Sequence, residues 1–195
     1  MRKPIGLALV LLMATSASEL HAQQSRLSPR DSVAVSVDDR EISVAWGSPS
    51  IRGRPIFGGL VPWGEVWRTG ANEATALRTE ADLVVGGQPV PAGSYTLYTI
   101  PEPDGWTLII NRETEQWGTR YDSSLDLARV PMRVEAIADP VERFTILLAS
   151  ELSGSLVEVE NARLRVGRIA LIMEWERTRA AVALELAPSE TVKED

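Results

Sequence analysis

Short stretches in which apolar and polar residues alternate recur along most of the chain, and they limit its fold more than any other feature. The first two, 33–37 and 42–46, flank a short polar turn at 38–40. A period of two predicts a β-strand with one buried face, and two such strands around a short turn predict a hairpin. No segment shows the sustained 3.6-residue period of an amphipathic helix. The sequence therefore predicts an all-β protein.

Further strands are expected between turn residues along the rest of the chain. They fall at 74–79, 83–85, 94–100, 106–111, 127–136, 143–149, 156–166, 168–175 and 180–186. About ten short strands at regular spacing favour a single-domain β-sandwich, with a jelly roll as one candidate topology. The stretch 47–70 is rich in Gly and Pro and predicts a long structured loop on this sandwich.

The N-terminal segment of the chain indicates export. Arg2 and Lys3 precede an apolar run at 5–14 and a zone of small and polar residues up to Ala22, which is the layout of a secretory signal. The alternative is a retained anchor, but the run is much shorter than the about 20 residues that span a bilayer. We therefore expect a secreted or periplasmic protein without a membrane span in its mature chain. The expected segments are a signal peptide at 1–22, a flexible lead-in at 23–29, a β-sandwich domain at 30–187 and a disordered acidic tail at 188–195.

Residue usage excludes many kinds of chemistry. The chain has no cysteine, its single histidine is His21 in the signal segment, and its only lysine beyond that segment is Lys193. These absences exclude Ser-His-Asp triads, cysteine nucleophiles, Schiff bases and histidine metal sites from the folded domain. Carboxylates, tyrosine and water remain for proton transfer. The sequence contains no cofactor-binding motif, so no cofactor is expected.

The charge balance limits the partners. The whole chain carries 20 basic and 27 acidic residues, a formal net charge of −7. An acidic protein repels nucleic-acid phosphates and anionic lipids. Neither nucleic acid nor a membrane surface is therefore an expected partner.

One segment carries a family resemblance. Residues 66–73 read Val-Trp-Arg-Thr-Gly-Ala-Asn-Glu, and 91–101 read Pro-Ala-Gly-Ser-Tyr-Thr-Leu-Tyr-Thr-Ile-Pro, followed by Gln-Trp-Gly at 116–118. This order of motifs resembles the bacterial family designated domain of unknown function 2911, over roughly 33–186. The resemblance implies an exported bacterial protein and no particular activity. Trp63 departs from the resemblance, because the family more often has tyrosine there.

Two tryptophans in the long loop are candidates for ligand binding. Trp63, Glu65 and Trp67 would share one face if this piece of chain were extended. Two indoles beside a carboxylate would then form a platform for a sugar or another flat, polar ligand. In the structural alternative, the tryptophans fill the end of the sandwich and Glu65 is a surface charge.

A second group of candidates surrounds Gly70. Arg68 and Asn72 could bind an anionic or hydroxylated ligand while Glu73 acts as an acid or base. The structural alternative is an Arg68–Glu73 pair with Asn72 bonded to the backbone. Trp117 lies in another loop and is expected to be exposed.

These features favour a non-catalytic binding or envelope-associated module that takes a carbohydrate or another polar small ligand. One alternative is a carboxylate-dependent hydrolase of glycosides, because two carboxyl groups can perform that reaction without histidine. Another is a structural partner of an envelope protein. Two carboxyl groups in a cleft would favour the enzyme, exposed indoles would favour ligand binding, and a contiguous apolar face would favour a protein partner.

Overall fold

The computed structural model describes residues 27–152, 155–158, 163–164 and 168–188. In these ranges the chain is all-β apart from one short 3-10 helix, which confirms the predicted fold class. The elements are β1 (Arg30–Val37), β2 (Arg40–Gly47), β3 (Thr75–Thr79), β4 (Leu83–Val85), β5 (Gln88–Val90), β6 (Gly93–Glu102), β7 (Gly105–Asn111), η1 (Ser123–Leu125), β8 (Asp126–Leu152), β9 (Ser155–Glu158), β10 (Arg163–Leu164) and β11 (Arg168–Leu186).

The predicted signal peptide at 1–22 lies outside the described residues, as do most of the lead-in at 23–29 and of the tail at 188–195. Export, the flexible lead-in and the disordered tail therefore stay predictions. Within the described part of the chain, no helix is long and apolar enough to cross a membrane.

Strands β1 and β2 form the hairpin that the first two alternating stretches predict. The paired register runs from Arg30 opposite Gly47 to Val37 opposite Arg40. Asp38 and Asp39 make the two-residue turn with φ angles of 49° and 61°. Two positive φ angles define the mirror-image turn whose twist matches that of the flanking strands. A short acidic turn thus sets the register of the first hairpin.

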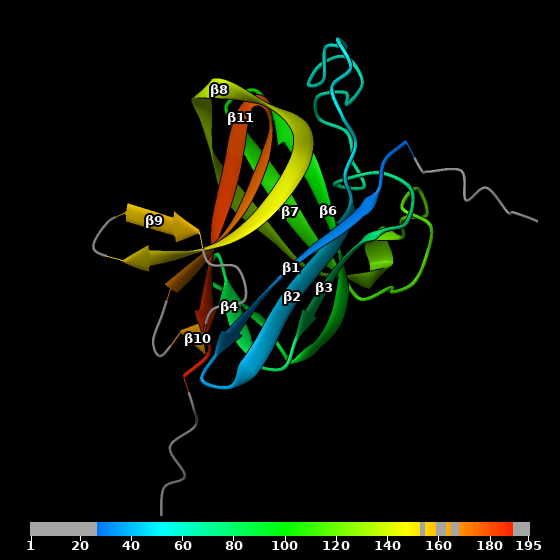
Figure 1. The fold of residues 1–195 in the computed structure, drawn as a ribbon. Helices are drawn as coiled ribbons and strands as arrows, with labels where there is room; N and C mark the ends of the chain where they lie inside the picture. The colour runs from blue at the N-terminus through cyan, green and yellow to red at the C-terminus, as the bar shows by residue number, and fades with distance from the viewer. Residues whose placement is uncertain (1–26, 153–154, 159–162, 165–167, 189–195) are drawn as a thin grey trace, which may run out of the picture.

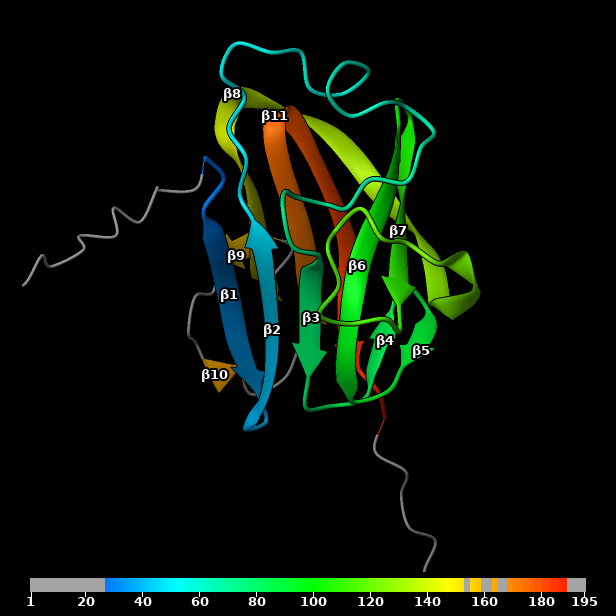
Figure 2. The ribbon, with the colours of Figure 1, turned by 90° about the vertical axis from the view of Figure 1, so that its right-hand side faces the viewer.

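The strands form a sheet that folds over into two layers. Their order is β10-β1-β2-β3-β6-β7-β8-β11-β4-β5, and β9 pairs with β8. Figure 2 shows β1, β2, β3 and β6 in front of β11, with β8 curving over the top, and Figure 1 shows the two layers from the side. The order is a meander with the β4–β5 hairpin inserted, rather than the Greek-key order of a jelly roll.

Strand β8 connects the layers. The sequence predicts separate strands at 127–136 and 143–149, but one strand of 27 residues covers both. Its first part pairs with β7, and most of its length pairs with β11. Register shifts occur on both sides of Glu176 in β11, which has a φ of 56°. Such bulges bend paired strands without ending them, so β11 also continues through the break predicted after 175.

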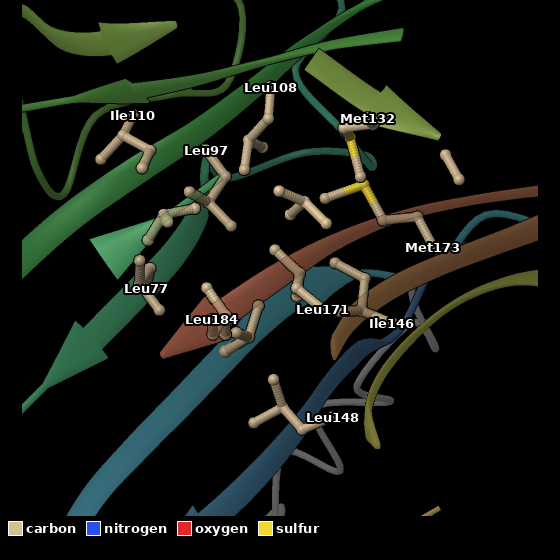
Figure 3. Close-up of a cluster of buried hydrophobic side chains, with 14 of the residues drawn as sticks. Leu77, Leu97, Leu108, Ile110, Met132, Ile146, Leu148, Leu171, Met173 and Leu184 are labelled. Carbon is tan, nitrogen blue, oxygen red and sulfur yellow. The ribbon is translucent and has the colours of Figure 1, made fainter. Parts of the chain in front are cut away.

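The hydrophobic core fills the space between the layers. Figure 3 shows its buried aliphatic side chains converging from both layers. Those labelled are Leu77, Leu97, Leu108, Ile110, Met132, Ile146, Leu148, Leu171, Met173 and Leu184. Burying a side chain of this size contributes about 1.5–3 kcal/mol relative to leaving it exposed. This packing, rather than disulfide bonds, stabilises a chain without cysteine.

Candidate functional site

The β2–β3 loop (48–74) extends from one end of the sandwich, as the Gly- and Pro-rich stretch 47–70 predicts (Figures 1 and 2). Isolated bridges fix it at defined points: Ser50 pairs with Arg143, and Trp67 pairs with Thr99 of β6. The second bridge has hydrogen bonds of 2.7 Å from Trp67 N to Thr99 O and of 2.9 Å from Thr99 N to Trp67 O. The loop is therefore ordered by backbone bonds although it contains no strand.

A turn at 69–72 is held in an unusual conformation. Thr69 and Asn72 have φ angles of 53° and 64°, and Gly70 has 147°. Asparagine tolerates the left-handed region, whereas a β-branched residue there is an outlier. Thr69 is fully buried, bonds to Thr99 Oγ1 at 3.1 Å and accepts at its carbonyl from Thr75 Oγ1 at 2.6 Å. Such strain persists only where the surroundings determine it, so this turn is firmly held.

Close contact with β2 holds the same turn from the other side. Ala71 N donates to Gly47 O at 3.1 Å. A Cβ on Gly47 would lie 1.9 Å from Ala71 O, and a Cβ on Gly70 would lie 2.8 Å from Gly47 O. Glycine is required at both positions because no side chain fits between the two backbones.

Trp67 belongs to an aromatic cluster at this end of the sandwich. Its ring stacks on Trp175 with centroids 5.8 Å apart and an interplanar angle of 14°. Phe144 meets it edge-on at 5.0 Å and Trp106 at 6.3 Å. Trp106 and Trp175 are buried, and Trp67 is half-buried. The indole of Trp67 therefore has a structural role as well as a place at the site.

Trp63 does not share a face with Trp67. The chain turns at 63–64, where Gly64 has a φ of 73°, so the piece is not extended as the platform hypothesis requires. Trp63 is 41% exposed and stacks on Phe57 with ring centroids 5.8 Å apart, and Glu65 is exposed. The glycine turn therefore prevents Trp63, Glu65 and Trp67 from forming the expected extended platform, although both indoles contact the ring of Phe57.

A cavity of about 980 Å³ lies beside this loop. Its lining comes from the chain before β1, the β2–β3 loop, β6, the β7–β8 loop (112–125) and β11. Four of the six residues that the sequence puts forward line it: Trp67, Arg68, Asn72 and Trp117. Distant parts of the chain thus meet at one hollow that contains most of the predicted candidates.

Arg68 and Asn72 lie together at this cavity. Arg68 Nε donates to Gly70 O at 3.2 Å, and Asn72 Nδ2 donates to Ser28 O at 3.1 Å. Both bonds go to backbone carbonyls, so they fix the two side chains without neutralising the guanidinium charge.

Glu73 lies at a different cavity. This second hollow, of about 580 Å³, is lined by Glu73 and Glu115 among others. The backbone turns at Asn72, and Glu73 then makes an isolated bridge to Trp117. Arg68, Asn72 and Glu73, which the sequence groups as one cluster, therefore do not share one site.

The β7–β8 loop supplies an adjoining part of the lining. Trp117 is 50% exposed, as predicted. Gly118 N donates to Asn72 O at 3.0 Å, which joins the two loops. A Cβ on Gly118 would lie 2.8 Å from Arg68 Cδ and 2.9 Å from Asn72 O. The absence of a side chain at 118 leaves room for the stem of Arg68.

Two tyrosines of the lining are held as neutral hydroxyls. Tyr121 donates to Asp126 Oδ2 and accepts from Arg129 Nη2, both at 2.7 Å. Burial, followed by the bond to Asp126, raises the pKa of Tyr121 to about 12, and burial also raises the pKa of Tyr98. Their rings lie 4.8 Å apart. Neither hydroxyl is suited to act as a base at neutral pH.

Sequence reasoning missed two arginines of the lining. Arg52 and Arg54 lie in the β2–β3 loop on either side of Gly53 and line the larger cavity with Arg68. Their presence in the Gly- and Pro-rich stretch was the available signal. In an irregular loop, however, a sequence spacing of two does not reveal where two side chains point.

Exposed apolar side chains gather at the same place. Six large hydrophobic residues of the described chain are exposed, and four of them line the larger cavity: Leu27, Leu60, Val66 and Trp117. Single exposed apolar residues are ordinary, but a group of them at a hollow marks a contact site.

Acidic residues near the β7–β8 loop are engaged by protein groups. Asp122 accepts from Ser124 N and Oγ, and Asp126 accepts from Tyr121 and Arg129. The bonds from Ser124 lower the pKa of Asp122. Among the described residues, no group of three or more His, Cys, Asp and Glu side chains has the arrangement to hold a metal ion.

A comparison with protein families gives one result. A family model described as protein of unknown function (DUF2911) matches residues 28–184. No curated protein and no solved structure matches the chain.

Proposed function

Because the chain belongs to the DUF2911 family of proteins of unknown function, we propose its function from the site itself. It is a non-catalytic binding protein that acts after export and binds a small polar ligand in the larger cavity. The observation that carries this proposal is the convergence of Trp67, Arg68, Asn72 and Trp117 on one hollow of about 980 Å³. Cavities of this size with a few polar groups among apolar ones are the usual form of small-molecule sites.

The absence of acid groups favours binding over hydrolysis at this cavity. Of the described residues, no Asp or Glu lines it. Its tyrosines have raised pKa values, so they stay protonated at neutral pH. Glycoside hydrolysis needs two carboxyl groups about 5–10 Å apart. The hydrolase alternative therefore depends on Glu73 and Glu115 at the smaller cavity.

The distribution of exposed apolar residues favours a small ligand over a protein partner. A structural partner would need a contiguous apolar face. The exposed apolar side chains of the described chain instead gather mainly around a hollow that also contains charged groups.

The test is equilibrium dialysis of the protein against a panel of sugars, sugar acids, aromatic acids and oligosaccharides, read by mass spectrometry. We expect at least one compound to be retained by the wild-type protein. Trp117→Ala should weaken its binding by up to about tenfold, because an aromatic contact contributes about 0.5–1.5 kcal/mol.

Trp63→Ala is the matched control, since it removes another exposed indole outside the lining of the cavity. Retention unaffected by Trp117→Ala, or no retention of any compound, would contradict the proposal. Cleavage of an oligosaccharide that disappears in Glu73→Gln would favour the hydrolase instead.

A further inference from the structure

The larger cavity is cationic although the protein is acidic. Arg52, Arg54 and Arg68 line it, and no acidic residue of the described chain does. The chain as a whole has a net charge of −7. Glu142, just outside the lining, accepts from the backbone N of Arg52 at 3.0 Å, which is a bond to the backbone rather than to a guanidinium. A hollow lined by one sign of charge raises the local concentration of ligands of the other sign.

The three guanidinium groups are positioned by backbone carbonyls. Arg52 Nη2 donates to Leu27 O at 2.6 Å, Arg68 Nε donates to Gly70 O at 3.2 Å, and Arg54 donates to two carbonyls of its own loop. In the described part of the chain, ion pairs are formed by other arginines, such as Arg129 and Arg179. Each of the three therefore keeps its charge and some N–H donors for a ligand. An arginine fixed in this way loses less freedom on binding.

The lining of the larger cavity also has apolar side chains. Leu60, Val66 and Trp117 are exposed and line the same cavity. Trp175 and Tyr98 line it too and are almost fully buried. A ligand with an apolar or flat body would pack against the exposed Leu60, Val66 and Trp117 while its charged group reaches the arginines.

We propose that the ligand of this cavity is a small organic oxyanion, with a carboxylate, phosphate or sulfate group bound by Arg52, Arg54 and Arg68 and with an apolar or aromatic body packed beside Trp117. The inference rests on the proposed binding function and specifies the class of ligand. Planar guanidinium groups bind such oxyanions with paired, charge-assisted hydrogen bonds.

The test compares three probes of nearly equal size by isothermal titration calorimetry: phenylacetate, phenyl phosphate and the neutral phenylacetamide. Both anions should bind at least about tenfold more tightly than the amide, because the amide cannot form charge-assisted hydrogen bonds. Added sodium chloride should weaken the binding of both anions and leave the affinity for the amide unchanged. Whichever anion binds more tightly identifies the preferred oxyanion.

Two variants locate the charge that is responsible. Arg68→Gln and the more exposed Arg52→Gln should each lower the affinity for the preferred anion about tenfold. Arg78→Gln is the control, because Arg78 lies outside the lining of the larger cavity. Anions that bind no better than the amide, or affinities unchanged in both variants, would overturn the assignment. If the dialysis test retained a neutral compound, and Trp117→Ala reduced that retention, the proposed binding function would stand and only the oxyanion assignment would be refuted.

Discussion

Replacing Gly47 by alanine tests whether close contact with β2 holds the turn of the β2–β3 loop. The new Cβ would lie 1.9 Å from Ala71 O, 2.8 Å from Ala71 C and 3.2 Å from Ala71 N. Ordinary contact begins near 3.4 Å, so the two backbones must separate by roughly 1.5 Å. That movement would also break the bond from Ala71 N to Gly47 O and displace Gly70, which lines the cavity.

The expected loss of stability is about 1–3.5 kcal/mol, and the 1.9 Å contact with a backbone atom favours the upper part of that range. Overpacking of this kind costs about 1–3 kcal/mol, and losing the backbone hydrogen bond adds about 1 kcal/mol. Alanine offsets about 0.4–1 kcal/mol of this by reducing the freedom of the unfolded chain. No positive φ is involved at Gly47, so the cost is steric.

Gly53→Ala is the matched control. Gly53 has a φ of 69° and open space around its Cβ position, so its substitution should cost only the about 1–2 kcal/mol of a left-handed residue. Urea denaturation followed by tryptophan fluorescence measures both variants. If Gly47→Ala proved no less stable than Gly53→Ala, the close contact would not be what positions the loop.

Two further predictions concern buried polar groups. Trp106→Phe should lower the free energy of unfolding by about 1–2 kcal/mol less than Trp46→Phe does. In the described part of the chain, Trp106 Nε1 has no hydrogen-bond partner to lose, whereas Trp46 Nε1 donates to Phe144 O at 3.1 Å. Equal losses in urea titrations would refute this difference. The free energy of unfolding should fall as pH rises from about 10 to about 12, because the folded state, with the pKa of Tyr121 at about 12, holds that proton more tightly than the unfolded chain. In Tyr121→Phe, the midpoint of urea unfolding should fall less steeply between pH values of about 10 and 12. A slope equal to that of the wild-type protein would contradict this prediction.

The parts of the fold that depend on local chemistry are readable from the sequence. Asp38 and Asp39, and likewise Gly86 and Gly87, occupy two-residue turns with positive φ, and alternating residues flank each turn. The course of β8 depends instead on its partner, because β11 bulges at Glu176 and so lets both strands continue where the sequence indicates breaks. Local patterns do not reveal such pairing between distant strands.

The site was readable to a lesser degree. Placing Arg68 and Asn72 together required only their closeness in a glycine-containing turn, and Trp117 was expected to be exposed. Glu73 was misplaced because the positive φ of Asn72 redirects the chain just before it. Arg52 was missed because its position depends on how a long loop folds back, which no local period encodes.

Because β8 pairs with β7 in one layer and with β11 in the other, neither layer can detach while the other keeps its full set of backbone partners. The sandwich is therefore one cooperative unit of unfolding rather than two. Tyr98 of β6 and Trp175 of β11 both line the larger cavity, so the proposed ligand would lie between the two halves of that unit. By mass action, a ligand that binds only the folded protein would then stabilise all strands of the sandwich together.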